Sequence, residues 1–262
     1  MTTIQDISKF LDEFAPLALA EEWDNVGLLL GDPAARADRI ITCLTLTEDV
    51  ADEAISAGAN LIVSHHPILF RKIQRITTHN VEGRMLLKLA AAGVAVYSPH
   101  TSYDSATGGI NRQLAESLGL TNIAPIRELE TDSASGSGRC GTLADAMSLN
   151  DFIAHVKSSL DLDKLQFVSG DGRTIGKAAV ACGSAAEFLR DASRKGCDVL
   201  VTGEARFHGL LEARAMGVAM ILLGHFASER PAMEHMAEVL SNQFAGVTVT
   251  ASESETDPLE WA

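Results

Sequence analysis

Short apolar runs alternate with amphipathic, helix-length segments along most of the chain. The apolar runs are rich in Val, Ile, Leu and Ala, and they are continuous rather than alternating with polar residues. This order predicts parallel strands that helices cover on both faces. We therefore predict an α/β fold with largely parallel sheets flanked by helices. The predicted strands include 41–43, 61–64, 94–98, 180–182, 199–202 and 218–223, and the predicted helices include 4–14, 48–57, 81–92, 148–160, 187–195 and 205–216.

The order strand, helix, strand, helix, strand occurs twice, and both copies end alike. A Gly-Val-Ala triplet at 93–95 and 217–219 begins the last strand, a histidine follows it (His100 or His225), and an acid lies four residues later (Asp104 or Glu229). A repeat of this kind indicates two similar α/β units from an internal duplication. The carboxyl ends of such strands are where α/β folds bind ligands, so we expect a metal site in the cleft between the units.

The division into domains follows from the same repeat. We predict a first, discontinuous α/β domain of residues 1–125 with 225–262 and a second of residues 126–224. Small polar residues from Thr131 to Arg139 predict a flexible loop near the boundary.

Charge and composition narrow the function. The chain has 35 acids against 21 Lys and Arg, a formal net charge of −14, which argues against nucleic-acid binding. The N-terminus has no basic region followed by an apolar core, and no apolar run approaches membrane-spanning length. We expect a cytoplasmic protein without a membrane partner, with its four cysteines reduced and buried.

Five of the residues at these strand ends form a mixed nitrogen and oxygen ligand set. His65 and His66 end one apolar strand and could both reach one centre where the chain turns, although one structural and one surface histidine is the plain alternative. Asp104 and Glu229 could likewise be solvated loop acids. Five ligands exceed the need of one tetrahedral zinc ion and suit two divalent ions, Zn, Fe or Mn. The predicted ligands are His65, His66, Asp104, His225 and Glu229.

Three further residues are candidates for the same site. His100 is either another ligand or a partner that orients Asp104, and we favour the second interpretation. Glu204 and His208 are candidates for proton transfer, since they follow the strand equivalent to that of His65. A surface helix start would explain both equally well.

Several motifs resemble the Nif-three-like dinuclear metal-centre proteins, which are also described as type 2 GTP cyclohydrolase I homologues. The resemblance implies two α/β domains, a two-metal site with the five ligands above, and a homohexamer. It also implies that longer members insert an extra domain near 131–139. The motifs are Glu22-Trp23-Asp24-Asn25-Val26-Gly27-Leu28, Ser64-His65-His66-Pro67, His100-Thr101-Ser102-Tyr103-Asp104, Thr202-Gly203-Glu204 and Gly224-His225-Phe226-Ala227-Ser228-Glu229-Arg230.

The resemblance implies hydrolysis of GTP to formate and 7,8-dihydroneopterin triphosphate. A small-molecule substrate with phosphates would need cations, for which Arg71, Lys72 and Arg230 are the candidates. Two alternatives stay open: a two-metal phosphoesterase or amidohydrolase of another substrate, and a non-enzymatic metal-binding or partner-binding protein.

Overall fold

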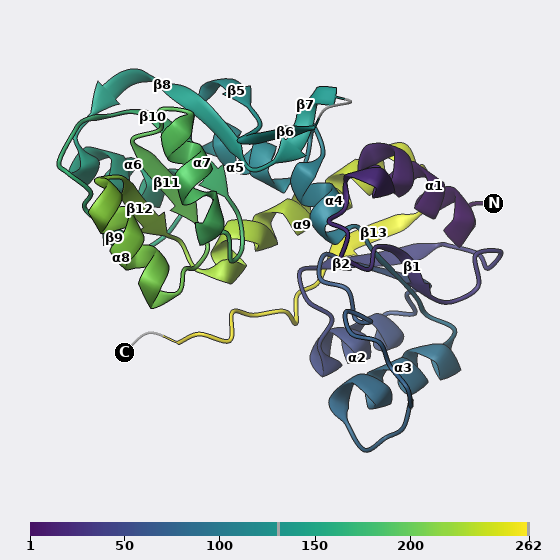
Figure 1. The fold of residues 1–262 in the computed structure, drawn as a ribbon. Coiled ribbons are helices and arrows are strands. Elements are labelled where there is room, and N and C mark those ends of the chain that lie inside the picture. The colour runs from purple at the N-terminus through teal and green to yellow at the C-terminus, as the bar shows by residue number, and fades with distance from the viewer. Residues whose placement is uncertain (130–131, 261–262) are drawn as a thin grey trace. The chain divides into compact units, whose positions relative to one another are not determined.

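The computed structural model describes residues 1–129 and 132–260 (Figure 1). The chain forms two compact units. Unit 1 is Met1–Tyr103 with Arg230–Ala262, and unit 2 is Asp104–Glu229. The sequence had suggested divisions at 125/126 and 224/225. None of the helices among the described residues is long and apolar enough to span a membrane.

Unit 1 contains a five-stranded sheet in the order β1-β4-β3-β2-β13. Four of its strands are parallel, and β1 lies antiparallel at one edge. The carboxyl ends of the parallel strands therefore share one edge of the sheet. The strands are β1 (Gly27–Leu30), β2 (Arg39–Cys43), β3 (Leu61–Ser64), β4 (Ala95–Ser98) and β13 (Thr248–Ala251).

Successive residues of each strand point to opposite sides of the sheet. Helices cover both faces. Ile41 and Cys43 pack with α2 (Glu48–Ser56) and α3 (Val81–Ala92), which lie side by side in Figure 1. On the other face, the Thr42 hydroxyl donates to the Met233 carbonyl of α9 (His225–Gln243) at 2.6 Å. The remaining helical segments of this unit are α1 (Ile4–Phe14) and a 3-10 turn, η1 (Leu17–Leu19), while α4 (His100–Ser105) carries the chain into unit 2.

Unit 2 contains a six-stranded sheet in the order β5-β8-β10-β11-β12-β9. Strands β10, β11 and β12 are parallel; β8 and β9 pair with them antiparallel, and β5 pairs antiparallel with β8. The strands are β5 (Thr121–Ala124), β8 (Arg139–Met147), β9 (Gln166–Val168), β10 (Ile175–Ala181), β11 (Val199–Thr202) and β12 (Ala219–Leu222).

Two apolar layers sandwich the sheet of unit 2. On one face, Val180 and Val201 pack with Leu114 of α5 (Ile110–Ser117) and Phe152 of α6 (Leu149–Ser159). On the other face, the alternate residues of the same strands pack against α7 (Leu189–Arg194) and α8 (Phe207–Met216). A 3-10 turn, η2 (Ala186–Phe188), precedes α7. The predicted α/β class, with helices on both faces of each sheet, is confirmed. Both units contain three consecutive parallel strands joined by helices, and their origin by duplication stays a prediction.

The prediction of a flexible loop from Thr131 to Arg139 is wrong over the residues that the structure describes; Thr131 lies outside them. Strand β7 (Asp132–Ser137) pairs with β6 (Arg127–Leu129), and β8 begins at Arg139. The small residues serve close packing: a Cβ on Gly136 would lie 2.1 Å from the Arg127 carbonyl oxygen. Arg139 is 1% exposed and donates to four main-chain carbonyls, those of Gly136, Gly138, Ser105 and Ala106.

Arg139→Ala should destabilise the protein by about 3 kcal/mol, because buried carbonyls then lose a charged donor. Chemical denaturation measures the change. Arg112→Ala is the control, since Arg112 makes an exposed pair with Glu116 and should cost less than about 0.5 kcal/mol. Equal stability of the two variants would show that the bonds from Arg139 to these four carbonyls do not stabilise the fold.

Candidate metal centre

Three imidazoles gather at the carboxyl edge of the unit 1 sheet. His65 and His66 follow β3, and His100 follows β4 after Pro99. One nitrogen of each ring lies within 4.8 Å of the nitrogens of the other two, a spacing that could hold a metal ion. The ring centroids are 5.1 Å apart for His65 and His66, and 5.2 Å apart for His65 and His100.

The backbone fixes the two adjacent histidines. The ladder between β2 and β3 continues past Ser64, since the His65 and His66 amides donate to the carbonyls of Cys43 and Leu44, each at 2.9 Å. The Ser64 hydroxyl donates to the His66 carbonyl at 2.8 Å and that of Ser98 to the His65 carbonyl at 2.6 Å. Main-chain bonds and two serine hydroxyls therefore fix the direction of the chain at this strand end.

His100 has a carboxylate partner that the sequence analysis did not identify. Its Nδ1 lies 2.7 Å from Oδ1 of Asp24, whose side chain is fully buried. Burial alone would raise the pKa of Asp24, but hydrogen bonds from His100 and Thr101 outweigh it and lower that pKa to about 2. Imidazoles that bind metals commonly donate their other N–H to a carboxylate. This pairing favours the ligand interpretation of His100, which the sequence analysis had ranked second.

Strain at His100 is a second sign of function. Its φ is 27°, in the left-handed region that non-glycine residues rarely adopt. Strained backbone of this kind concentrates at functional sites. The order of the strands explains the contact between Asp24 and His100. Asp24 precedes β1, and β1 runs antiparallel beside β4, which His100 follows.

Unit 2 places an imidazole between two carboxylates at the corresponding edge of its own sheet. His225 follows β12, and its Nδ1 and Nε2 lie 3.1 Å from Oε1 of Glu204 and 3.1 Å from Oε2 of Glu229. The Glu229 hydrogen bond is the largest cause of a His225 pKa raised to about 9. Gly183 makes room for Glu229, since a Cβ there would lie 2.3 Å from its Oε1.

Asp104, the first residue of unit 2, is held by two residues that the sequence analysis did not assign to the site. The Cys182 thiol donates to Oδ1 of Asp104 at 3.3 Å, and Asn111 donates to the Asp104 carbonyl at 3.1 Å. Asn111 in turn accepts from the Cys182 amide at 2.8 Å. Burial and the neighbouring carboxylates raise the pKa of the Cys182 thiol, so it stays a neutral donor.

The donor chemistry of both clusters suits divalent ions such as zinc, iron or manganese. Unit 1 offers imidazole nitrogens, and unit 2 offers one imidazole with carboxylate oxygens. Imidazole suits zinc and iron, and carboxylate suits manganese, so a mixed set of this kind does not by itself select one of the three. The side chains present therefore fit the predicted metal.

The other predicted site residues have different surroundings. His208 lies exposed on α8, with its ring 6.0 Å from that of Phe207. Arg71 and Lys72 line a cavity of about 850 Å³ in unit 1. Arg230 is engaged within unit 1 by the Glu255 carboxylate and the Ser252 carbonyl, which disfavours a role in binding substrate phosphates.

Asp24→Asn should weaken zinc binding by about 10- to 100-fold, because the amide no longer fixes the His100 ring as the carboxylate does. Competition with a chromogenic chelator measures the affinity. Glu22→Gln, an exposed neighbour that loses the same charge, should bind as the unchanged protein does. An Asp24 variant with unchanged affinity would exclude this role.

In metal-free protein, NMR titration should show His225 deprotonating near pH 9, with Glu229→Gln lowering its pKa more than Glu204→Gln does. Folding stabilises the protonated ring here. Its contribution to stability is therefore complete below the ordinary pKa of 6.5 and is lost as the pH rises through about 9. A His225 pKa near 6.5 in the unchanged protein would contradict the observed geometry.

The chain is similar to known proteins along nearly its whole length. A protein of Clostridium perfringens named GTP cyclohydrolase 1 type 2 homolog is 35% identical over 259 residues, which cover 98% of this chain and 99% of the relative. Protein NIF3 homolog of Schizosaccharomyces pombe is 34% identical over 97% of this chain and 96% of its own. A crystal structure of a Staphylococcus aureus protein superposes with a TM-score of 0.91 at 28% identity, covering 100% of this chain and 99% of that one. The model of Duf34/NIF3 (NGG1p interacting factor 3) matches residues 2–258, so the chain belongs to this family.

Proposed function

We propose that this protein is a metal-dependent hydrolase that binds two divalent ions. The observation that carries the proposal is the gathering of three imidazoles at the carboxyl edge of one sheet. The pairing of His225 with Glu229 at the corresponding edge of the other sheet supports it. The proposed ligands are His65, His66, Asp104, His225 and Glu229, and His100 is a further candidate.

Both proposed carboxylate ligands of unit 2 lie at the limits of that unit. Asp104 is the first residue of unit 2 and Glu229 is its last. Each is joined by a peptide bond to a residue of unit 1, Tyr103 or Arg230. The two proposed carboxylate ligands of unit 2 are therefore the residues through which the chain enters and leaves that unit.

Divalent ions in such a centre would lower the pKa of water and polarise the substrate, which permits hydrolysis at neutral pH. The protein residues would hold and move protons around that step. Glu204 is an exposed carboxylate whose Oε1 lies 3.1 Å from Nδ1 of His225, and it is our candidate for proton transfer. His208 is a second candidate, by its position four residues further along the chain.

The substrate that we propose is a nucleotide, with GTP as the leading candidate because of the names that relatives bear. The cavity of about 850 Å³ in unit 1 has the chemistry that a nucleotide needs. Trp23 and Phe70 offer partly exposed aromatic rings to a purine, with centroids 5.8 Å apart. Arg71, Lys72 and Arg75 offer cations to phosphates in a chain whose net charge is −14. From the resemblance we also propose a homohexamer, which light scattering can test, and from the charge and the N-terminal sequence we propose a cytoplasmic location.

Elemental analysis of protein purified without added metal should find two equivalents per chain, falling to near zero in the double variant His65→Ala, Glu229→Ala. His235→Ala, Glu238→Ala is the matched control, because it removes an exposed histidine and glutamate pair. Retention of both equivalents in the first variant would show that the metal is bound elsewhere.

Metal-loaded protein should release formate from GTP, and Asp104→Ala should abolish the release. An enzymatic formate assay follows the reaction, with zinc, iron(II) and manganese(II) forms compared. Stable metal binding without formate release from any of the three forms would contradict the GTP assignment.

A further inference from the structure

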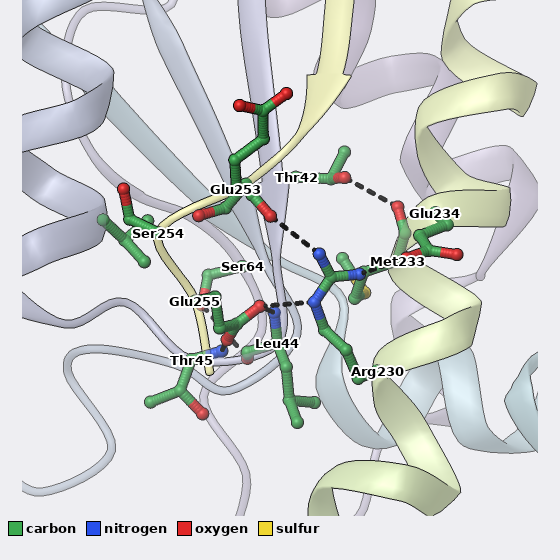
Figure 2. Close-up of polar contacts among 12 residues, drawn as sticks. Thr42, Leu44, Thr45, Ser64, Arg230, Met233, Glu234, Glu253, Ser254 and Glu255 are labelled. Atoms are coloured by element: carbon green, nitrogen blue, oxygen red, sulfur yellow. Dashed lines mark hydrogen bonds and ion pairs between the residues drawn. The ribbon is translucent and has the colours of Figure 1, made fainter. Parts of the chain in front are cut away.

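The segment after β13 inserts a buried carboxylate beside the histidine-bearing edge of unit 1. The side chain of Glu255 is 3% exposed. Its two oxygens accept from the amides of Leu44 at 2.9 Å and Thr45 at 2.6 Å, which follow β2 directly. Nε of Arg230 lies 2.8 Å from the same carboxylate, and Figure 2 shows these contacts together.

Further contacts fix the backbone of this segment. Arg230 donates to the Ser252 carbonyl at 2.8 Å. The carboxylate of Glu53, on α2, accepts from the amides of Glu253 at 2.9 Å and Ser254 at 3.2 Å. Because a charge buried without a partner is costly, the donors around Glu255 indicate a specific binding position for the C-terminal segment, and the contacts with Glu53 add to it.

Thr45 connects that binding position to the histidine cluster. Its amide donates to Glu255, and its Oγ1 lies 2.7 Å from Nδ1 of His66, within hydrogen-bond distance. A ring nitrogen in a hydrogen bond does not bind a metal at the same time. Binding by His66 therefore goes through Nε2, which needs the proton of the neutral ring on Nδ1.

We propose that Glu255 and Thr45 are positioning residues for metal binding by His66. Glu255 holds the turn after β2 through its two amides, and the turn presents the Thr45 hydroxyl to His66. Nδ1–H of His66 then donates to Oγ1 of Thr45, which orients the ring and fixes its tautomer. The importance of this arrangement rests on the proposed metal-binding function, while the tautomer itself can be measured without metal.

The first test compares Thr45→Val, which keeps the side-chain shape and loses the hydroxyl, with Thr45→Ser, which keeps the hydroxyl. Nitrogen-15 NMR of metal-free protein should show His66 protonated on Nδ1 in the unchanged protein and in Thr45→Ser. In Thr45→Val the proton should move partly or wholly to Nε2. Zinc affinity should fall about 10- to 100-fold in Thr45→Val and be restored in Thr45→Ser.

The second test removes the carboxylate charge in Glu255→Gln, with Glu253→Gln as the control because it makes the same change at an exposed site two residues earlier on the segment. Glu255→Gln should shift the His66 tautomer and weaken zinc binding in the direction of Thr45→Val, and Glu253→Gln should change neither. The melting temperature is recorded for every variant. If Glu255 serves only the stability of the fold, Glu255→Gln lowers the melting temperature and leaves the His66 tautomer and the zinc affinity unchanged.

The results separate this inference from the proposed function. An unchanged His66 tautomer in both Thr45→Val and Glu255→Gln overturns the positioning role, even where metal binds tightly. A shifted tautomer in a protein that binds none of zinc, iron(II) and manganese(II) shows that Thr45 and Glu255 orient the His66 ring, and it contradicts the metal-dependent function instead.

Discussion

The alignment of parallel strand ends is the constraint on which the rest of this structure depends. Strands β2, β3 and β4 run in one direction with fixed register, so the residues that follow them meet at one edge although the sequence separates them. The main-chain bonds of this edge hold His65 and His66 in place. The same arrangement in unit 2 brings Glu204, after β11, to His225, after β12. Each unit thus forms a polar cluster at the edge of an apolar sheet.

Electrostatics explains why such clusters suit cations. Burial of several carboxylates and imidazoles disfavours the charged forms unless opposite charge compensates them. In unit 2 the carboxylates of Glu229 and Glu204 raise the pKa of His225, which favours a proton on the ring as the compensating charge. A divalent ion would supply more charge in the same surroundings, and it would displace the proton. The strongly acidic chain as a whole favours cations over anions, which makes the cationic segment at 71–75 a local exception.

Much of this architecture could be predicted from the sequence because it depends on local patterns. The helix predicted over 81–92 has those bounds in the structure, and the predicted strands 61–64 and 199–202 are equally accurate. The histidines at strand ends were recognisable for the same reason. Asp24, Thr45 and Glu255 were not, since their contacts depend on which segments the topology brings to that edge. The error at 131–139 has a different cause: small residues permit flexibility and close packing alike, and only the position of the Arg127 backbone shows which applies.

We propose that imidazole and carboxylate groups of this chain bind a divalent metal. X-ray absorption spectroscopy of zinc-loaded protein is the decisive measurement, because it identifies the atoms around the ion independently of any activity. We expect a shell of nitrogen and oxygen atoms at about 2.0–2.1 Å with the outer scattering of several imidazole rings. A sulfur shell at about 2.3 Å, or a spectrum without imidazole scattering, would contradict it.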